Sequence, residues 1–166
     1  MNYEYFMKSS LAQAKKALSA GEFPVGCAIV YNEQIIATGM RIKTATKNFN
    51  ELDHAEIRAL RMLGDFEKPL EHKEITLFCT LEPCMMCFGA ILLRGIGRIV
   101  YAYEDVMGGC TNCDLTKISP LYASKNTSII SGVLRQESLE LFQKYFADSE
   151  NEYLKDTLLA KYTLKM

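Results

Sequence analysis

Apolar positions recur along the chain with two spacings, one typical of helices and one typical of strands. Residues 3–20 are predicted to form a helix, because four apolar side chains share one face at helical spacing: Phe6, Leu11, Ala14 and Leu18. Runs rich in β-branched and aromatic residues predict five strands, with a turn at Asn32-Glu33 between the first two. These strands are expected at residues 25–31, 34–39, 75–79, 98–103 and 128–133.

Further helices are predicted between and after these strands, at residues 53–63, 83–94, 136–147 and 150–161. Pro83 is placed at the first position of its helix, where a missing N–H costs nothing. Strands flanked by helices indicate an α/β fold, a three-layer α/β/α sandwich around a central five-stranded mixed sheet. Because no repeat and no Pro/Gly/Ser linker interrupts the chain, residues 1–166 are predicted to form a single domain.

Composition and charge exclude several classes of protein. The chain has 166 residues, 49% of them apolar, and Lys plus Arg (19) against Asp plus Glu (20) leaves a net charge of −1. This balance provides no general positive field to hold nucleic acid. No apolar run approaches the roughly 20 residues of a membrane span, and the first residues lack a signal-peptide pattern. The six cysteines are therefore expected to be reduced thiols or metal ligands, and we expect the protein in the cytoplasm.

Two short motifs, at residues 54–56 and 83–87, carry the candidate chemistry. Cys84 and Cys87 are three residues apart, so they share a helix face near the positive end of the helix dipole, where thiolate is favoured. Two thiolates and one imidazole form a three-ligand zinc site whose fourth position stays open to water. His54 is the natural third ligand, because the only other histidine, His72, lies in a charged stretch. The pattern predicts one Zn²⁺ per chain.

Glu56 follows His54 by two residues, within the same predicted helical turn. From there its carboxylate can reach water acidified by zinc, take its proton as a general base and return it as a general acid. Two alternatives stay open at this point. Asp53 and Glu56 also fit a capping box, and a lone Cys-x-x-Cys motif in a cytosolic chain is often structural or redox-active.

A His-x-Glu motif followed by Pro-Cys-x-x-Cys is typical of zinc nucleobase deaminases. With these motifs, and with residues 23–26 and 89–90, the chain resembles the cytidine deaminase-like superfamily, most closely the branch of tRNA adenosine deaminases and guanine deaminases. The resemblance spans nearly the whole chain. It implies a cytidine deaminase-like fold, a homodimer, and the replacement of an exocyclic amine of a nucleobase by a carbonyl with release of ammonia. It also implies that the Ala55 N–H and the Glu82 carbonyl bind the substrate ring, and that Val25 packs on its face.

The resemblance leaves the substrate open between adenosine in a tRNA anticodon loop and a free base or nucleoside such as guanine or cytosine. Arg41 stands where many relatives carry a base-reading Asn, and Asn48 or Asn50 is a candidate replacement. Arg41 could instead pair with a carboxylate or phosphate of the substrate, or lie in solvent beside a turn. The loop at residues 104–114 is bracketed by acids where the tRNA enzymes are basic.

Three further alternatives concern the surface and the other cysteines. Four apolar residues are candidates for a dimer interface, with core packing as the alternative: Met85, Met86, Ile91 and Leu92. Tyr162 is a candidate for closing a neighbouring site, against a packed or frayed terminus. Cys110 and Cys113 form a second Cys-x-x-Cys pair, and with Cys84 and Cys87 they resemble the four-Cys structural zinc site of an interaction module.

Overall fold

A five-stranded sheet forms the centre of the computed structural model, which describes residues 1–45, 49–64 and 69–166. The strands lie in the order β2-β1-β3-β4-β5, with β1 antiparallel to both of its neighbours and with β3, β4 and β5 parallel. The predicted mixed sheet is therefore confirmed. Its strands are β1 (Gly26–Tyr31), β2 (Gln34–Met40), β3 (Thr76–Leu81), β4 (Arg98–Tyr103) and β5 (Ser128–Ile130).

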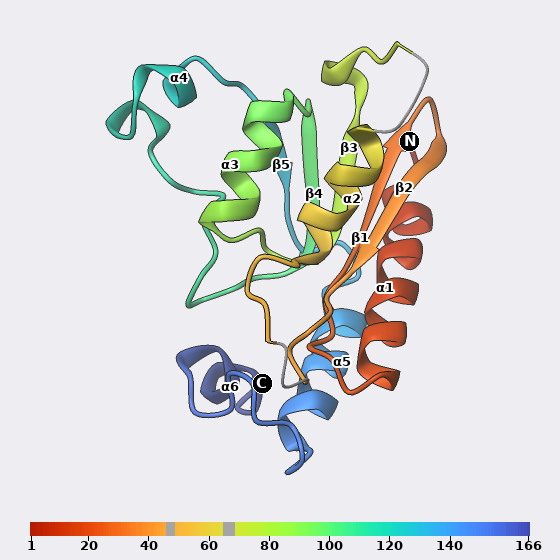
Figure 1. Cartoon of the computed structure of the whole chain (residues 1–166), viewed down its shortest axis with the longest axis vertical. Helices are drawn as coiled ribbons and strands as arrows, with labels where there is room; N and C mark the ends of the chain where they lie inside the picture. The colour runs from red at the N-terminus through yellow and green to blue at the C-terminus, as the bar shows by residue number, and fades with distance from the viewer. Residues whose placement is uncertain (46–48, 65–68) are drawn as a thin grey trace.

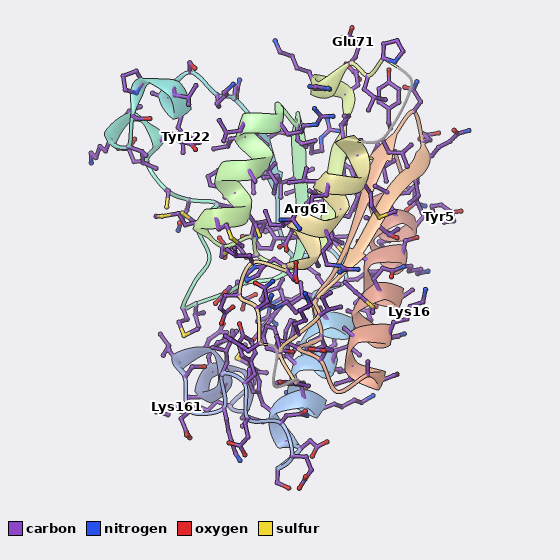
Figure 2. All side chains as sticks on the ribbon, viewed as in Figure 1. Tyr5, Lys16, Arg61, Glu71, Tyr122 and Lys161 are labelled. Carbon is purple, nitrogen blue, oxygen red and sulfur yellow. The ribbon has the colours of Figure 1, made fainter. Side chains whose placement is uncertain are left out.

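Helices cover both faces of the sheet, as Figure 1 shows. One face carries α1 (Tyr3–Ser19), and the other carries α2 (Ala55–Gly64) and α3 (Met85–Arg94). The helix α5 (Arg135–Ala147) packs beside α1 and contributes side chains to the apolar clusters of both faces. Each face has its own apolar cluster because strand side chains alternate between faces: Phe78 packs with α1, whereas Leu77 packs with α2 and α3. On α1, Tyr5 and Lys16 project into solvent (Figure 2). The three-layer α/β/α sandwich is confirmed.

The hairpin of β1 and β2 fixes the position of α2 over the sheet. Asn32 and Glu33 have φ values of 48° and 58°, the positive values that a type I′ turn requires, so the predicted turn is confirmed. A Cβ atom at Gly39 would lie only 2.1 Å from the carbonyl oxygen of Ala55. Glycine at this position lets the start of α2 rest directly on β2, and this contact sets the height of residues 54–56 above the sheet.

Four predicted element boundaries are wrong by two or three residues. The second helix begins at Ala55, not at residue 53, and the third strand ends at Leu81, not at residue 79. The third helix begins at Met85, not at Pro83, because Cys84 has extended backbone and precedes the first turn. The fifth strand ends at Ile130, not at residue 133, because Gly132 and Leu134 take positive φ values of 80° and 53° and turn the chain into α5. Among the described residues, the structure also contains short helical turns that the pattern did not predict: η1 (His72–Glu74), η2 (Leu115–Lys117) and α4 (Pro120–Ala123).

The predicted helix at residues 150–161 is wrong. The chain instead makes turns up to Thr157, whose side chain accepts a hydrogen bond from the Ala160 N–H, and α6 (Leu158–Thr163) begins there. Leu154 has a φ of 60°, which no helix interior allows. Among the described residues, no helix is both long and apolar enough to cross a lipid bilayer.

Candidate metal and active site

The three predicted zinc ligands come together at the starts of two neighbouring helices. His54 immediately precedes α2, Cys84 immediately precedes α3, and Cys87 lies in the first turn of α3. The Nδ1 atom of His54 is 3.6 Å from the Sγ atom of Cys84 and 3.5 Å from that of Cys87. The three donor atoms lie within 4.8 Å of one another, so these residues are positioned to bind a metal ion.

The spacing of these donors fits zinc. Zinc binds thiolate sulfur at about 2.3 Å and imidazole nitrogen at about 2.0–2.1 Å, so two such donors on a tetrahedron lie about 3.6 Å apart. The two sulfur–nitrogen distances match this edge length. The hydrogen bond with Cys87, opposed by burial and assisted by His54, lowers the pKa of the Cys84 thiol to about 4. Thiolate is the ligand form, so the donor set is chemically suited to this metal.

Glu56 lies beside the donor group without belonging to it. Its side chain is 3% exposed, and its Oε2 atom accepts a contact of 3.6 Å from the Cys87 thiol. Burial raises the pKa of this carboxyl above the ordinary glutamate value. The capping-box alternative does not hold. The hydrogen bonds and ion pairs of the Asp53 carboxylate go to side chains of Lys43, Asn50 and Arg61, and Glu56 turns toward the sulfur atoms.

A pocket opens next to these residues, and all three predicted substrate-binding residues line it. Val25 lies just before β1, Ala55 begins α2, and Glu82 follows β3. The wall also contains Arg41, which the sequence offered as a candidate substrate contact. Its other members were not assigned to the site from the sequence: Phe23, Glu51, Leu81, Asp105, Met107, Gly108, Tyr153, Leu154 and Leu159. Since Glu56, His54 and Cys84 belong to the same wall, a molecule in this pocket would contact the predicted catalytic group and the metal ligands together.

The side chain of Glu82 holds the loop that follows β4. Its carboxylate accepts hydrogen bonds from the backbone N–H groups of Asp105 and Thr111 and from the Thr111 hydroxyl. A Cβ atom at Gly109 would lie 2.3 Å from this carboxylate, so the glycine permits the close approach. The loop also pairs with the start of α3, where Gly109 forms a β-bridge with Cys84. The side chain of Glu82 thus has a structural role, which leaves its backbone for the predicted substrate contact.

The four-Cys alternative is not assembled by the fold. Among the described residues, the donors close enough to hold one metal ion are His54, Cys84 and Cys87, and neither Cys110 nor Cys113 joins them. Cys110 is 4% exposed and hydrogen-bonds through its backbone N–H to the Pro83 carbonyl. The second cysteine pair begins in the segment that contacts Pro83 and Cys84, but it supplies no donor to the group of metal ligands.

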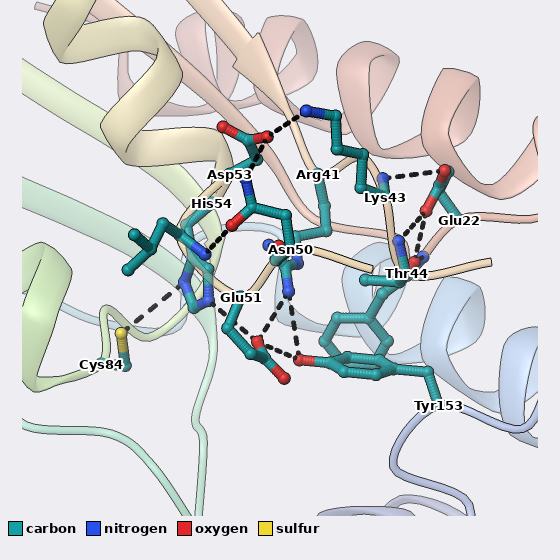
Figure 3. A network of polar contacts seen from close by, with 12 residues as sticks. Glu22, Arg41, Lys43, Thr44, Asn50, Glu51, Asp53, His54, Cys84 and Tyr153 are labelled. Carbon is teal, nitrogen blue, oxygen red and sulfur yellow. Dashed lines mark hydrogen bonds and ion pairs between the residues drawn. The ribbon is translucent and has the colours of Figure 1, made fainter. Parts of the chain in front are cut away.

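Arg41 and Asn50, two candidates for contact with the substrate, both have hydrogen-bond partners within the chain. Asn48, the third candidate, lies outside the described residues. Arg41 is 2% exposed and pairs with a carboxylate, but this carboxylate belongs to Glu51 of the same chain, 2.8 Å away. The Asn50 side chain bonds to Asp53 and to the Leu52 N–H, so it is used within its own turn. Figure 3 shows this network beside His54.

Tyr153 and Glu51 are site residues that sequence analysis missed. Tyr153 falls within the segment predicted as a helix, and no local pattern points its ring toward residues more than a hundred positions earlier. Its hydroxyl donates a 2.9 Å hydrogen bond to Glu51. Glu51 carried a usable signal, since it is an acid three residues before the candidate ligand His54. Tyr162 is the sequence candidate for closing a neighbouring site. In the structure its hydroxyl donates a hydrogen bond to Glu104 of its own chain.

Comparison with known proteins agrees with this geometry. Residues 1–103 match the family model of the cytidine and deoxycytidylate deaminase zinc-binding region. The tRNA-specific adenosine deaminase of Bacillus subtilis is 30% identical over 149 residues, covering 87% of this chain and 89% of that protein. A solved structure from work on A-to-I editing by tRNA:A34 deaminases at the wobble position of transfer RNA has 30% identity and a TM-score of 0.67. It covers 82% of this chain and 98% of that one.

The X-ray structure of guanine deaminase from Bacillus subtilis is also similar, with 32% identity and a TM-score of 0.55. Here the match covers 63% of this chain and 66% of the other, less than the match to the tRNA:A34 deaminase structure. The matched family region contains His54, Glu56, Cys84 and Cys87. His54, Glu56 and Cys84 line one pocket, and the buried Cys87 completes the donor group beside it. The chain therefore belongs to the cytidine and deoxycytidylate deaminase family of zinc-dependent hydrolytic deaminases.

Proposed function

We propose that His54, Cys84 and Cys87 bind one zinc ion and that Glu56 is the catalytic proton carrier of a nucleobase deaminase. The observation that carries the proposal is the position of the Glu56 carboxylate, buried beside the donor group and in the wall of the pocket. Bound zinc acidifies water and so supplies hydroxide near neutral pH. Glu56 takes the proton of the attacking water and delivers it to the departing exocyclic nitrogen. The ring carbon gains a carbonyl oxygen, its bond to that nitrogen breaks, and ammonia leaves.

Three residues are proposed to hold the substrate ring in reach of Glu56. The Ala55 N–H donates and the Glu82 carbonyl accepts a hydrogen bond, which fixes the edge of the ring, while the Val25 side chain packs on its face. All three line the pocket, and Val25 and Ala55 are buried. Such contacts orient the reacting carbon and exclude water, and orientation supplies a large part of enzymatic rate enhancement.

The first candidate substrate is adenosine in a tRNA anticodon loop. The support is the similarity to tRNA-specific adenosine deaminases, which extends over 87% of this chain. A free base or nucleoside is the second candidate, and a specific observation favours it. The pocket wall carries the carboxylates of Glu51 and Asp105. Tyr153 and Leu154 of the C-terminal segment also belong to this wall. The Asp105 carboxylate in this wall repels the phosphates of RNA, whereas the Glu51 carboxylate is paired with Arg41.

A comparison of substrates tests the proposed function. Zinc-loaded protein is incubated with an anticodon stem-loop RNA and with free bases, nucleosides and pterin-like heterocycles, and ammonia release is measured with Glu56→Ala as the blank. Release from RNA that falls steeply with salt would assign the tRNA substrate, because RNA binding releases counterions. Release from one small heterocycle with little salt dependence would assign the second candidate. Zinc-dependent release from none of them would contradict the proposed substrate range.

We also propose a homodimer in the cytoplasm. Ile91 and Leu92 are buried in the core, and Met86 is half-buried. Met85 and Leu93 are 67% and 52% exposed on α3, and Leu93 lines a groove between α2 and α3. An exposed apolar surface of this kind is typical of an interface. All six cysteines are free thiols, in keeping with a reducing compartment. Sedimentation equilibrium is expected to give twice the mass of one chain, and Leu93→Asp is expected to give a single-chain mass. A wild-type protein that sediments as a single chain at micromolar concentration would contradict the dimer.

A further inference from the structure

A buried arginine lies in the same pocket wall as the metal ligands His54 and Cys84. The Arg41 side chain is 2% exposed, and a buried guanidinium is stable only when paired. Its Nη1 donates to the Asn50 carbonyl at 3.1 Å, and its Nη2 donates to Glu51 Oε2 at 2.8 Å and to the Tyr153 hydroxyl oxygen at 3.3 Å. Its guanidinium also lies 5.5 Å from the centre of the Tyr153 ring. The charge of Arg41 is therefore engaged within the chain and serves to hold Glu51.

Glu51 faces the side of the His54 ring opposite the two sulfur atoms. Its Oε2 atom is 3.7 Å from His54 Nε2, while the Nδ1 atom of the same ring points to Cys84 (Figure 3). The Cys87 sulfur is also close to this Nδ1 atom, at 3.5 Å. A carboxylate at Nε2 favours the tautomer that carries its proton there, which leaves the Nδ1 lone pair for the metal. At 3.7 Å the interaction is an electrostatic pairing, longer than a hydrogen bond.

Tyr153 brings the C-terminal segment into the same network. Its hydroxyl donates to Glu51 Oε2 at 2.9 Å, and its ring packs against Phe23 and Phe49, with centroids 5.3 Å and 5.7 Å away. Burial raises the pKa of the Tyr153 hydroxyl to about 12, so it stays a proton donor at neutral pH. The turns between α5 and α6 are therefore connected through Tyr153 and Glu51 to the ring of a metal ligand.

We propose that Glu51 is a positioning residue that fixes the tautomer and orientation of His54, and that Arg41 and Tyr153 hold Glu51 in place. The inference rests on the proposed zinc site. It assigns to Arg41 a role in metal retention rather than in contact with a substrate phosphate or base. It also makes the affinity for zinc depend on a tyrosine that lies 99 positions after the ligand in the sequence.

Zinc affinity tests this inference without any substrate. Glu51→Gln keeps the size of the side chain but removes its charge, and outer-shell changes of this kind typically cost about 10- to 100-fold in metal affinity. We expect a loss in this range when zinc is competed against a chromogenic chelator. Arg41→Met is expected to give a similar loss, and Tyr153→Phe a smaller one. In the cobalt-loaded Glu51→Gln protein the visible ligand-field spectrum is expected to shift, because the orientation of one ligand changes.

The Arg41 and Glu51 effects are expected not to add in the double variant, since both act through the same contact. Glu150→Gln is the matched control, because it removes one exposed carboxylate from the same C-terminal region and is expected to leave zinc affinity unchanged. Thermal unfolding of each zinc-free variant measures any general loss of stability and separates it from metal release.

An unchanged zinc affinity and cobalt spectrum in Glu51→Gln would overturn the inference, whether or not activity falls. Activity lost at full zinc affinity would instead place Glu51 in direct contact with substrate. Failure of the zinc site itself is recognised separately. In that case Cys84→Ser would bind zinc as the wild type does, and the proposed function would fail together with this inference.

Discussion

Replacing Glu56 by alanine is expected to lower the rate of ammonia release by about 10²- to 10⁴-fold, the usual contribution of a general acid–base group. The same carboxylate serves the attacking water and the leaving nitrogen, so its loss affects both proton transfers. Zinc content is expected to stay at one per chain, because Glu56 lies outside the group of metal donors. Activity and zinc content are measured on the same preparation.

The outcome for Glu56→Ala is interpretable only if the protein still folds. Glu56 is 3% exposed, and burial raises its pKa, so removing the carboxyl is not expected to destabilise the chain strongly. Circular dichroism and thermal unfolding check this. Glu150→Ala serves as a control for the loss of a carboxylate elsewhere. A Glu56→Ala variant that folds, binds zinc and retains activity within about threefold of the wild type would contradict the assigned role.

Cys84→Ser is expected to abolish tight zinc binding, whereas Cys110→Ser combined with Cys113→Ser is expected to retain one zinc per chain. Serine is a poor zinc ligand at neutral pH, and two protein donors do not hold the ion as three do. Zinc raises the melting temperature of a protein that binds it only when folded, so added zinc is expected to stabilise the double variant but not Cys84→Ser. Elemental analysis after dialysis measures the stoichiometry.

The two cysteine variants decide between an open catalytic site and a closed structural one. If Cys110→Ser with Cys113→Ser lost its zinc, the four-Cys alternative would be restored in spite of the geometry described above. Retention of zinc by Cys84→Ser would mean that the ion is bound elsewhere. Cys27→Ser is an unsuitable control because this residue is fully buried in β1. Cys113→Ser alone, at a half-buried position, is the better control for the effect of replacing a cysteine outside the proposed donor group.

Much of the metal site was predictable because it depends on local sequence. His54 and Glu56 are two residues apart, Cys84 and Cys87 are three apart, and both pairs stand at helix starts. The i,i+3 spacing predicts one face for Cys84 and Cys87, and the short separation of His54 and Glu56 keeps both at one helix start. The only long-range question is then whether the two helix starts meet. The sandwich topology answers it, since α2 and α3 lie on the same face of the sheet.

The C-terminal wall of the pocket was not predictable in the same way. Residues 150–161 contain apolar and charged residues at spacings that also suit a helix, and tertiary contacts override that preference. Tyr153 packs against Phe23 and donates to Glu51, and Leu154 takes a left-handed conformation. The two contacts of Tyr153 join segments more than a hundred residues apart. No local pattern in the sequence encodes such a pairing.

The zinc coordination shell of the wild-type protein is the most direct test of an open His54, Cys84 and Cys87 site. X-ray absorption at the zinc edge is expected to show two sulfur neighbours at about 2.3 Å and two nitrogen or oxygen neighbours at about 2.0–2.1 Å. This shell corresponds to three protein donors and one position left for the reaction. Four sulfur neighbours at about 2.3 Å would contradict it and would make the ion structural, with Cys110 and Cys113 as ligands.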